Sequence, residues 1–263
     1  MGVMSYIVKL SDLPERLDSL DLILDKIVEG DCLELMRRMP DKCVDAVITD
    51  PPYFQPAEHY ASRDWTWGRC WGDNSILGSF FGQCLAEHKR TLKEVGSVFY
   101  FINDQAFPIL FVAGYGIFRH IRLLIWDKGE GHYSLGSGYV FRKRHELIAH
   151  LHSPSPFYNE GNRYDVIVHR VVPNAERDHP AEKPETIASI LLSASVPGGG
   201  LIFDPFLGSG TTAVAAKKLG RHFIGCEISP DYCRIAERRL QELDAQPGLF
   251  EKPRQPEQIL LSP

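Results

Sequence analysis

The sequence predicts an α/β fold with a mainly parallel sheet, and three stretches carry this prediction. Residues 201–203 are apolar and lead into a glycine-rich turn, and residues 213–219 follow with helical spacing. A second apolar stretch, 221–226, ends in an acid. A third, 44–49, is rich in β-branched residues and ends in an acid followed by two prolines. Strands that alternate with helices favour a parallel sheet whose carboxyl ends hold ligands.

The other elements follow from apolar spacing along the chain. Further strands are expected at 22–28, 97–102, 118–126 and 146–152, and further helices at 32–39, 77–92 and 107–114. Residues 1–20 are polar and mixed, and we expect them to form an N-terminal arm. Residues 244–263 carry prolines among polar residues and are expected to form a C-terminal tail. The main domain is therefore expected at 21–243.

Composition and charge limit the class of protein. A chain of 263 residues with 44% hydrophobic residues can bury the core of one α/β domain. The net charge of −5 argues mildly against non-specific coating of nucleic acid, although a local basic face suffices to bind DNA. The six cysteines show no CxxC pairing, so we expect free thiols in a cytoplasmic protein and no metal site. No apolar run approaches the length of a membrane span.

The tetrapeptide formed by Asp50, Pro51, Pro52 and Tyr53 carries the groups from which we infer chemistry. The Asp50 carboxylate and the Pro51 carbonyl can each accept an N–H bond from an exocyclic amino group. Two such acceptors localise the nitrogen lone pair and stabilise the positive charge that develops as the nitrogen attacks. Tyr53 offers a ring face to an unstacked base. Taken alone, the tetrapeptide also fits a strand followed by a capped Pro-Pro turn without chemistry.

The glycine-rich turn at residues 204–212 (DPFLGSGTT) predicts a second binding site. Glycines permit a tight turn and the close approach of a ligand. The N-terminus of the following helix directs free N–H groups at that ligand. Glu227 ends the next strand, where an acid in a nucleotide-binding βαβ unit binds ribose hydroxyls. The turn, the flanking strand and helix, and this acid together indicate a nucleotide-like cofactor.

With these two motifs in this order, the chain resembles the β class of S-adenosylmethionine-dependent amino-group DNA methyltransferases. Enzymes of this class belong to restriction-modification systems or act as orphan methyltransferases, without a paired endonuclease. The resemblance covers most of the chain. It implies a Rossmann-like, seven-stranded, mostly parallel methyltransferase sheet with helices on both faces, one reversed strand and a circularly permuted motif order. Residues 21–243 would then be the methyltransferase domain.

The resemblance also assigns roles to individual residues. Asp50, Pro51, Pro52 and Tyr53 would form the catalytic tetrapeptide, and Glu227 would bind the cofactor ribose. Residues 179–184 (HPAEKP) match a segment that precedes the helix beside the methionine end of the cofactor. The expected cofactor contacts are Asp31, Cys32, Asp50, Lys183, Asp204, Phe206, Gly208, Ser209, Gly210, Thr211 and Glu227.

Recognition of DNA is expected from two regions. Residues 126–128 (WDK) match a family segment, and the candidate target-recognition region is 129–178. Residues 54–80 contain three tryptophans and are expected to be a lid or DNA loop, with a surface loop as the alternative. The recognition region is short, so a homodimer is one possibility. The expected DNA contacts are Lys128, Arg142, Lys143 and Arg144, and a solvated charged turn is the alternative interpretation of this cluster.

These observations predict a site-specific DNA methyltransferase that transfers a methyl group from S-adenosylmethionine to N6 of a flipped-out adenine. An aspartate at position 50 resembles the adenine-N6 enzymes more than the cytosine-N4 enzymes, where serine is usual. Cytosine N4, an RNA base or protein glutamine remain alternative substrates for the same site. A cofactor-binding regulator without catalysis is the non-enzyme alternative. We expect DNA as the partner, with no membrane and no metal.

Overall fold

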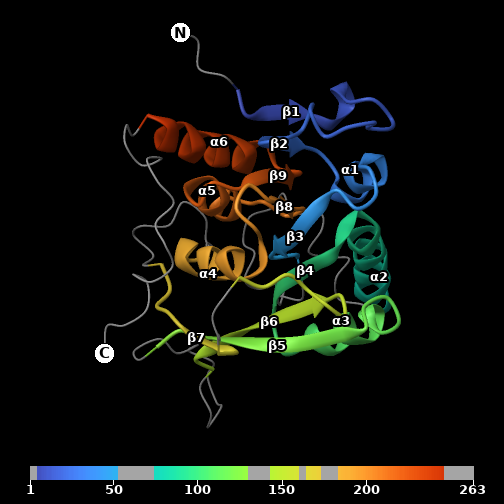
Figure 1. The fold of residues 1–263 in the computed structure, drawn as a ribbon, viewed down its shortest axis with the longest axis vertical. Helices are drawn as coiled ribbons and strands as arrows, with labels where there is room; N and C mark the ends of the chain where they lie inside the picture. Colours follow the sequence, from blue (N-terminus) through green and yellow to red (C-terminus); the bar gives the residue numbers. More distant parts are fainter. Residues whose placement is uncertain (1–4, 53–73, 130–142, 160–163, 173–182, 246–263) are drawn as a thin grey trace.

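A computed structural model describes residues 5–52, 74–129, 143–159, 164–172 and 183–245. In this part of the chain a nine-stranded sheet has the order β1-β2-β9-β8-β3-β4-β6-β5-β7 (Figure 1). Among these strands, β6 runs antiparallel to both its neighbours, and the other pairings are parallel. The strands are β1 (Ile7–Lys9), β2 (Lys26–Glu29), β3 (Val44–Thr49), β4 (Leu92–Ile102), β5 (His120–Asp127), β6 (His145–His152), β7 (Val166–Val168), β8 (Leu201–Asp204) and β9 (His222–Glu227).

Helices cover both faces of the sheet (Figure 1). One buried cluster joins the sheet to α1, α2 and α3, and a second joins it to α4, α5 and α6. The alternation of side chains along β4 divides them, since Tyr100 and Ile102 enter the first cluster while Phe99 and Phe101 enter the second. The helices are α1 (Cys32–Arg38), α2 (Asn74–Thr91), α3 (Phe107–Gly114), α4 (Glu185–Ser195), α5 (Thr211–Lys218) and α6 (Pro230–Asp244).

The α/β class, the mostly parallel sheet and the helices on both faces are confirmed, but the expected number of seven strands is wrong. The two additional strands, β1 and β7, lie at opposite edges and have three residues each. Three residues are too few to display a period of two in the sequence. The expected N-terminal arm also differs, because β1 pairs with β2 and the side chains of Leu10, Leu13 and Leu17 are buried.

The expected strand at 22–28 begins later, at Lys26, and the turn before it explains the difference. Asp25 has a left-handed backbone with φ of +54°. Its carboxylate accepts a hydrogen bond from the Phe223 backbone N–H at 3.0 Å. The apolar residue Ile23 is fully buried without being in the strand. Burial in a turn therefore produced the apolar signal that the sequence pattern attributes to a strand.

Two strand pairings place the motifs. β8 lies between β9 and β3, so the strand before the glycine-rich turn is hydrogen-bonded to the strand before Asp50. β2 pairs with β9 in a register that aligns Val28 with Cys226. The two ends of the chain are therefore joined in one sheet. The carboxyl ends of β2, β9, β8, β3 and β4 meet at one edge, which is where α/β sheets bind ligands.

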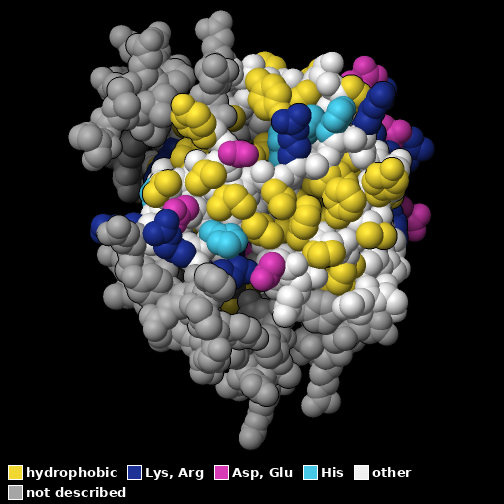
Figure 2. Space-filling model, turned by 90° about the horizontal axis from the view of Figure 1, so that it is seen from below, with side chains coloured by type: hydrophobic (Ala, Val, Ile, Leu, Met, Phe, Trp, Pro, Cys, Tyr) yellow, Lys and Arg dark blue, Asp and Glu magenta, His cyan; other side chains and the backbone are white. Residues whose placement is uncertain are grey.

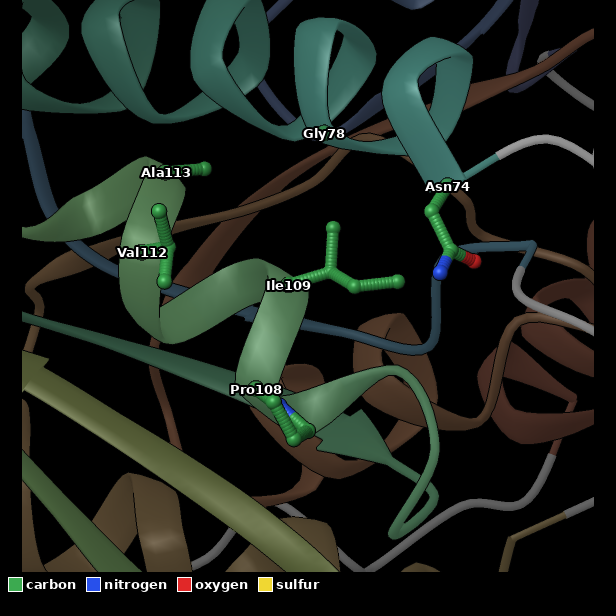
Figure 3. A pocket seen from close by; sticks show the side chains of 6 residues that line it. All are labelled: Asn74, Gly78, Pro108, Ile109, Val112 and Ala113. Carbon is green, nitrogen blue, oxygen red and sulfur yellow. The ribbon is translucent and has the colours of Figure 1, made fainter.

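The end of the molecule formed by β5 and α3 has an apolar surface. Figure 2 shows hydrophobic side chains gathered on this face, with charged side chains and histidines around them. On α3, Phe111, Val112 and Tyr115 at its C-cap are exposed by 39%, 74% and 77%. A groove of about 420 Å³ runs between α3 and the start of α2 (Figure 3). It is lined by Asn74, Gly78, Pro108, Ile109, Val112 and Ala113.

Candidate active site

The two sequence motifs meet through one buried hydrogen bond. Thr49 ends β3, and its hydroxyl donates to Asp204 Oδ1 at the end of β8, at 2.7 Å. The same carboxylate accepts the backbone N–H of Phe206 at 3.1 Å. Burial, with a smaller contribution from the nearby Asp50 carboxylate, raises the pKa of Asp204 to about 7 despite these hydrogen bonds. Asp204 thus braces the turn against β3; its expected contact with a cofactor stays a prediction.

The turn after β8 has two glycines with left-handed backbones. Gly210 has φ of +84°, and a Cβ there would lie 2.8 Å from Cβ of Ala236 on α6. Gly208 has φ of +54°, but a Cβ there would meet no heavy atom within 4 Å. Position 210 therefore needs glycine for packing as well as for backbone angle. Beside Gly208 the structure leaves open space, at the N-terminal end of α5, where a ligand can approach the backbone.

Two acids lie at the ends of the strands beside this turn. Glu227 is 9% exposed, and its carboxylate accepts the backbone N–H groups of Gly208 at 2.9 Å and Ser229 at 2.8 Å. Burial raises the pKa of Glu227. Asp31 follows β2 and caps α1, since its Oδ1 accepts the Glu34 N–H at 2.9 Å. The expected contacts of Glu227 with the ribose and of Asp31 with the cofactor stay predictions.

Arg239 on α6 is a residue that the sequence analysis did not find. Its Nη1 donates to the Ser209 carbonyl at 2.9 Å, to Ser209 Oγ at 3.0 Å and to Thr211 Oγ1 at 3.3 Å. Both hydroxyls accept hydrogen bonds from this guanidinium group, and the expected cofactor contacts of Ser209 and Thr211 stay predictions. Ser229, which caps α6, followed by Pro230 is a helix-start signal that predicts α6. Nothing in the sequence predicts which residue of α6 reaches the turn.

Asp50 lies directly after β3 and is engaged by Lys183. Lys183 Nζ lies 2.8 Å from Asp50 Oδ2 and 3.2 Å from Glu146 Oε2. Pro51 is buried and Pro52 is exposed, while Tyr53 lies outside the described residues. Lys183 therefore contacts the first residue of the tetrapeptide, and its expected contact with the cofactor stays a prediction. Glu146 is a second residue that the sequence analysis did not find.

The expected DNA-binding cluster is less cationic than its sequence suggests. Lys143 Nζ lies 2.8 Å from Asp104 Oδ1, and Arg144 Nη2 lies 2.6 Å from Asp127 Oδ2. The ammonium group of Lys128 lies 2.6 Å from Glu146 Oε1, on the same network as Lys183. Arg142 lies outside the described residues, as do residues 54–73 of the expected lid and much of the expected recognition region.

The described cysteines and helices bear on two further expectations. Cys32, at the start of α1, is buried, and so are the thiols of Cys84 and Cys226. The five cysteines in the described part of the chain are free. No group of three or more His, Cys, Asp or Glu side chains placed to hold a metal occurs among the described residues. None of the helices described is long and apolar enough to cross a membrane.

Comparison with known proteins gives consistent matches. Residues 44–238 match the model of a family described as DNA methylase, with N6 and N4 members. The chain is 28% identical to type II methyltransferase M.HinfI of Haemophilus influenzae, over 89% of this chain and 73% of that protein. It is 26% identical to the DNA adenine methyltransferase YhdJ of Escherichia coli K12, over 81% and 82%. Its fold matches TTHA0409 of Thermus thermophilus in complex with S-adenosyl-L-methionine, with a TM-score of 0.61, 21% identity and coverage of 84% and 96%.

Replacing Arg239 by methionine should loosen the glycine-rich turn. The substitution keeps much of the aliphatic contact but removes three hydrogen bonds from the turn. Hydrogen bonds to a charged group contribute about 1.5–3 kcal/mol, so we expect amide exchange at 206–212 to become about tenfold faster or more. Hydrogen–deuterium exchange with mass spectrometry measures this. Arg238→Met is the matched control, because that neighbouring side chain is 54% exposed. Equal exchange in the wild type and both variants would show that Arg239 does not hold the turn.

Proposed function

Because the chain belongs to the DNA methylase family, we propose that it transfers the methyl group of S-adenosylmethionine to the exocyclic N6 of adenine, in a base flipped out of a specific DNA site. The observation that carries this proposal is the junction of β3 with β8. The Thr49–Asp204 hydrogen bond places Asp50 next to the turn that is expected to hold the cofactor. A methyl acceptor at Asp50 and a methyl donor at the turn would thus be neighbours.

The residues of the tetrapeptide orient the amino group and stabilise its charge. S-adenosylmethionine supplies an electrophilic methyl group. The Asp50 carboxylate and the Pro51 carbonyl accept the two N–H bonds of the target amine, which localises its lone pair. The positive charge that develops on nitrogen lies beside the Asp50 carboxylate, and it is lost when the methylated amine releases a proton to Asp50 or to solvent. The consecutive prolines fix the direction of the Pro51 carbonyl, because each ring restricts φ. Tyr53 completes the tetrapeptide as the proposed stacking partner of the base.

The turn and the neighbouring acids support the cofactor assignment. The open space beside Gly208 lets a ligand approach the backbone, and the start of α5 lies at the same place. Glu227 and Asp31 stand at the ends of adjacent strands, and we assign them to the ribose and to the adenine side of the cofactor. Phe206 follows Asp204 in the turn, and its ring centroid lies 5.9 Å from that of Phe80 on α2. These residues fit an adenosyl group with a short charged tail.

Adenine is the base that the observations favour. The match to YhdJ, a protein named as a DNA adenine methyltransferase, agrees with the aspartate that begins the tetrapeptide here. Cytosine N4 is the second candidate, since the family includes enzymes for both amines and either amine fits two acceptors. DNA contacts are proposed for Lys143 and Arg144, together with Arg142. Their carboxylate partners would be exchanged for phosphates, which contribute most of the affinity for DNA.

The cysteines support a location in the cytoplasm, where DNA and S-adenosylmethionine are both available. The described cysteines are free, and four of the five are buried. A reducing compartment keeps such thiols unpaired. We therefore retain the cytoplasmic assignment as part of the proposal.

Replacing Asp50 by alanine should abolish methyl transfer while leaving cofactor binding largely intact. The substitution removes the carboxylate that accepts the amine, and Lys183 keeps Glu146 as an ion-pair partner. We expect the rate of methyl transfer to fall by about a hundredfold to a thousandfold, the loss typical of one preorganised electrostatic group. Single-turnover assays on DNA measure the rate, and calorimetry measures binding of S-adenosylmethionine. Asp41→Ala is the control, since that carboxylate is 72% exposed and pairs with Arg90. A wild-type rate in Asp50→Ala would contradict the proposed mechanism.

The apolar face of α3 supports a homodimer as the acting form. Val112 is 74% exposed and lines the groove beside α2 (Figure 3). Tyr115 at the end of the helix is 77% exposed. Contiguous exposed apolar side chains surrounded by charged ones are typical of protein interfaces. A second copy of the chain is the occupant we propose, because two subunits would supply the recognition surface that a short target-recognition region does not provide alone.

Replacing Val112 by glutamate tests the homodimer. A carboxylate buried at the centre of an apolar interface is strongly unfavourable, so we expect the wild type to sediment as a dimer and Val112→Glu as a monomer. Sedimentation velocity at micromolar concentration distinguishes them. Val95→Glu, an equally apolar and 47% exposed position at the start of β4, is the control and should remain dimeric. A monomeric wild type would refute the homodimer without affecting the proposed reaction.

A further inference from the structure

Four charged side chains form a continuous chain that ends at the proposed catalytic aspartate. Asp50 Oδ2 lies 2.8 Å from Lys183 Nζ, which in turn lies 3.2 Å from Glu146 Oε2. The other oxygen of Glu146, Oε1, lies 2.6 Å from Lys128 Nζ. Carboxylates and ammonium groups therefore alternate, and the charges of the four groups sum to zero. Lys183 stands between two carboxylates and is shared by them.

The direction of β6 brings Glu146 to this edge of the sheet. β6 runs antiparallel to β4 and β5, so its first residues lie where the parallel strands end. Glu146 pairs in register with Trp126 near the end of β5. Its neighbour on the same face, Ile148, belongs to the cluster covered by α4, and Lys183 lies just before that helix. The Glu146 side chain therefore meets Lys183 over β4, on the side opposite Asp50.

The network lies on aromatic side chains and is largely shielded from water. Lys183 Nζ lies 5.4 Å above the ring of Phe101 on β4, and Lys128 Nζ lies 5.4 Å from that of Trp126. The side chains of Lys183 and Glu146 are 14% and 23% exposed. Electrostatic interactions are stronger in such surroundings than at a solvated surface. Burial raises the pKa of Glu146, but Lys183 and Lys128 outweigh it and lower that pKa to about 2.

We propose that Glu146 is a positioning residue for the methyl transfer: it holds Lys183 from the side opposite Asp50 and so leaves the Asp50 carboxylate able to accept the amino group of the target base. This inference rests on the function proposed above. Without Glu146, Lys183 would bind Asp50 alone and compete with the target amine for the same carboxylate. With Glu146 present, Lys183 keeps Asp50 ionised and aligned. When the base enters, Lys183 can stay paired with Glu146 and release the Asp50 oxygen to the target amine.

The charges facing Glu146 determine how its removal acts. They are Lys128 after β5 and Lys183 before α4, with Asp50 after β3 beyond Lys183. The buried Asp204 carboxylate in turn lies near Asp50 and is unchanged in the variants below. Removing the Glu146 charge removes a repulsive carboxylate from the surroundings of Asp50 and strengthens its pairing with Lys183. Both effects favour the ionised form of Asp50. Removing Lys128 acts in the opposite direction, because Glu146 then draws Lys183 away from Asp50.

The test compares Glu146→Gln with the wild type on DNA at saturating substrate. We expect kcat to fall about tenfold or more, while the dissociation constant of S-adenosylmethionine stays within about twofold, as for a group that acts on the reacting amine. The acidic limb of the kcat–pH profile should move to lower pH by about half a unit or more, because Asp50 becomes more acidic. Glu146→Asp should restore part of the rate, since it restores the charge. Glu94→Gln, which removes an exposed pair with Lys42, is the control and should match the wild type.

A second variant keeps the inference falsifiable if Glu146→Gln folds poorly. In Lys128→Gln the acidic limb should move to higher pH, opposite to its movement in Glu146→Gln. The inference would be overturned if the acidic limb of the kcat–pH profile did not move in Glu146→Gln or in Lys128→Gln, and if Glu146→Gln and Glu146→Asp lowered the rate equally. Glu146 would then have only a structural role. A wild type that methylates no DNA would instead refute the proposed function, so the two failures are distinguishable.

Discussion

The hydrogen bond from Thr49 to Asp204 is the constraint on which the site depends. It joins residues 155 positions apart and ties the end of β3 to the end of β8. The Asp204 carboxylate also holds the Phe206 backbone, so the position of the glycine-rich turn is set relative to the strand that leads into Asp50. Because the bond is buried, breaking it would leave polar groups without water, which is unfavourable. The proposed methyl donor and acceptor are thereby held by one rigid junction.

A second constraint is electrostatic and comes from the reversed strand. The carboxyl edge of a parallel sheet collects the residues that follow each strand, here Asp50, Asp31 and the turn after Asp204. β6 runs the other way, and so contributes a residue from its beginning, Glu146. An acid at this place pairs with both Lys183 and Lys128, and without it Lys183 would pair with Asp50 alone. The site therefore combines a fixed backbone with a charge network in which one lysine is shared.

Much of the fold follows from the sequence, because its signals are local. Asp50 with its two prolines and the glycines at 208 and 210 identify the ends of the two strands that precede them. The edge strands β1 and β7 were not predicted, because three residues cannot show the two-residue alternation of a strand. Glu146 and Arg239 escape for a different reason. Their roles arise from contacts between elements far apart in sequence, which no local pattern records.

The most direct test of the proposed methyl transfer to adenine N6 is to identify the atom that receives the methyl group. Purified protein is incubated with isotopically labelled S-adenosylmethionine and duplex DNA of mixed sequence, and the DNA is digested to nucleosides that are separated and weighed by mass spectrometry. We expect the label in N6-methyladenine. Label in N4-methylcytosine would preserve the chemistry of Asp50 but contradict the assigned base. DNA without label, from protein that binds S-adenosylmethionine, would contradict the assignment of DNA as the substrate.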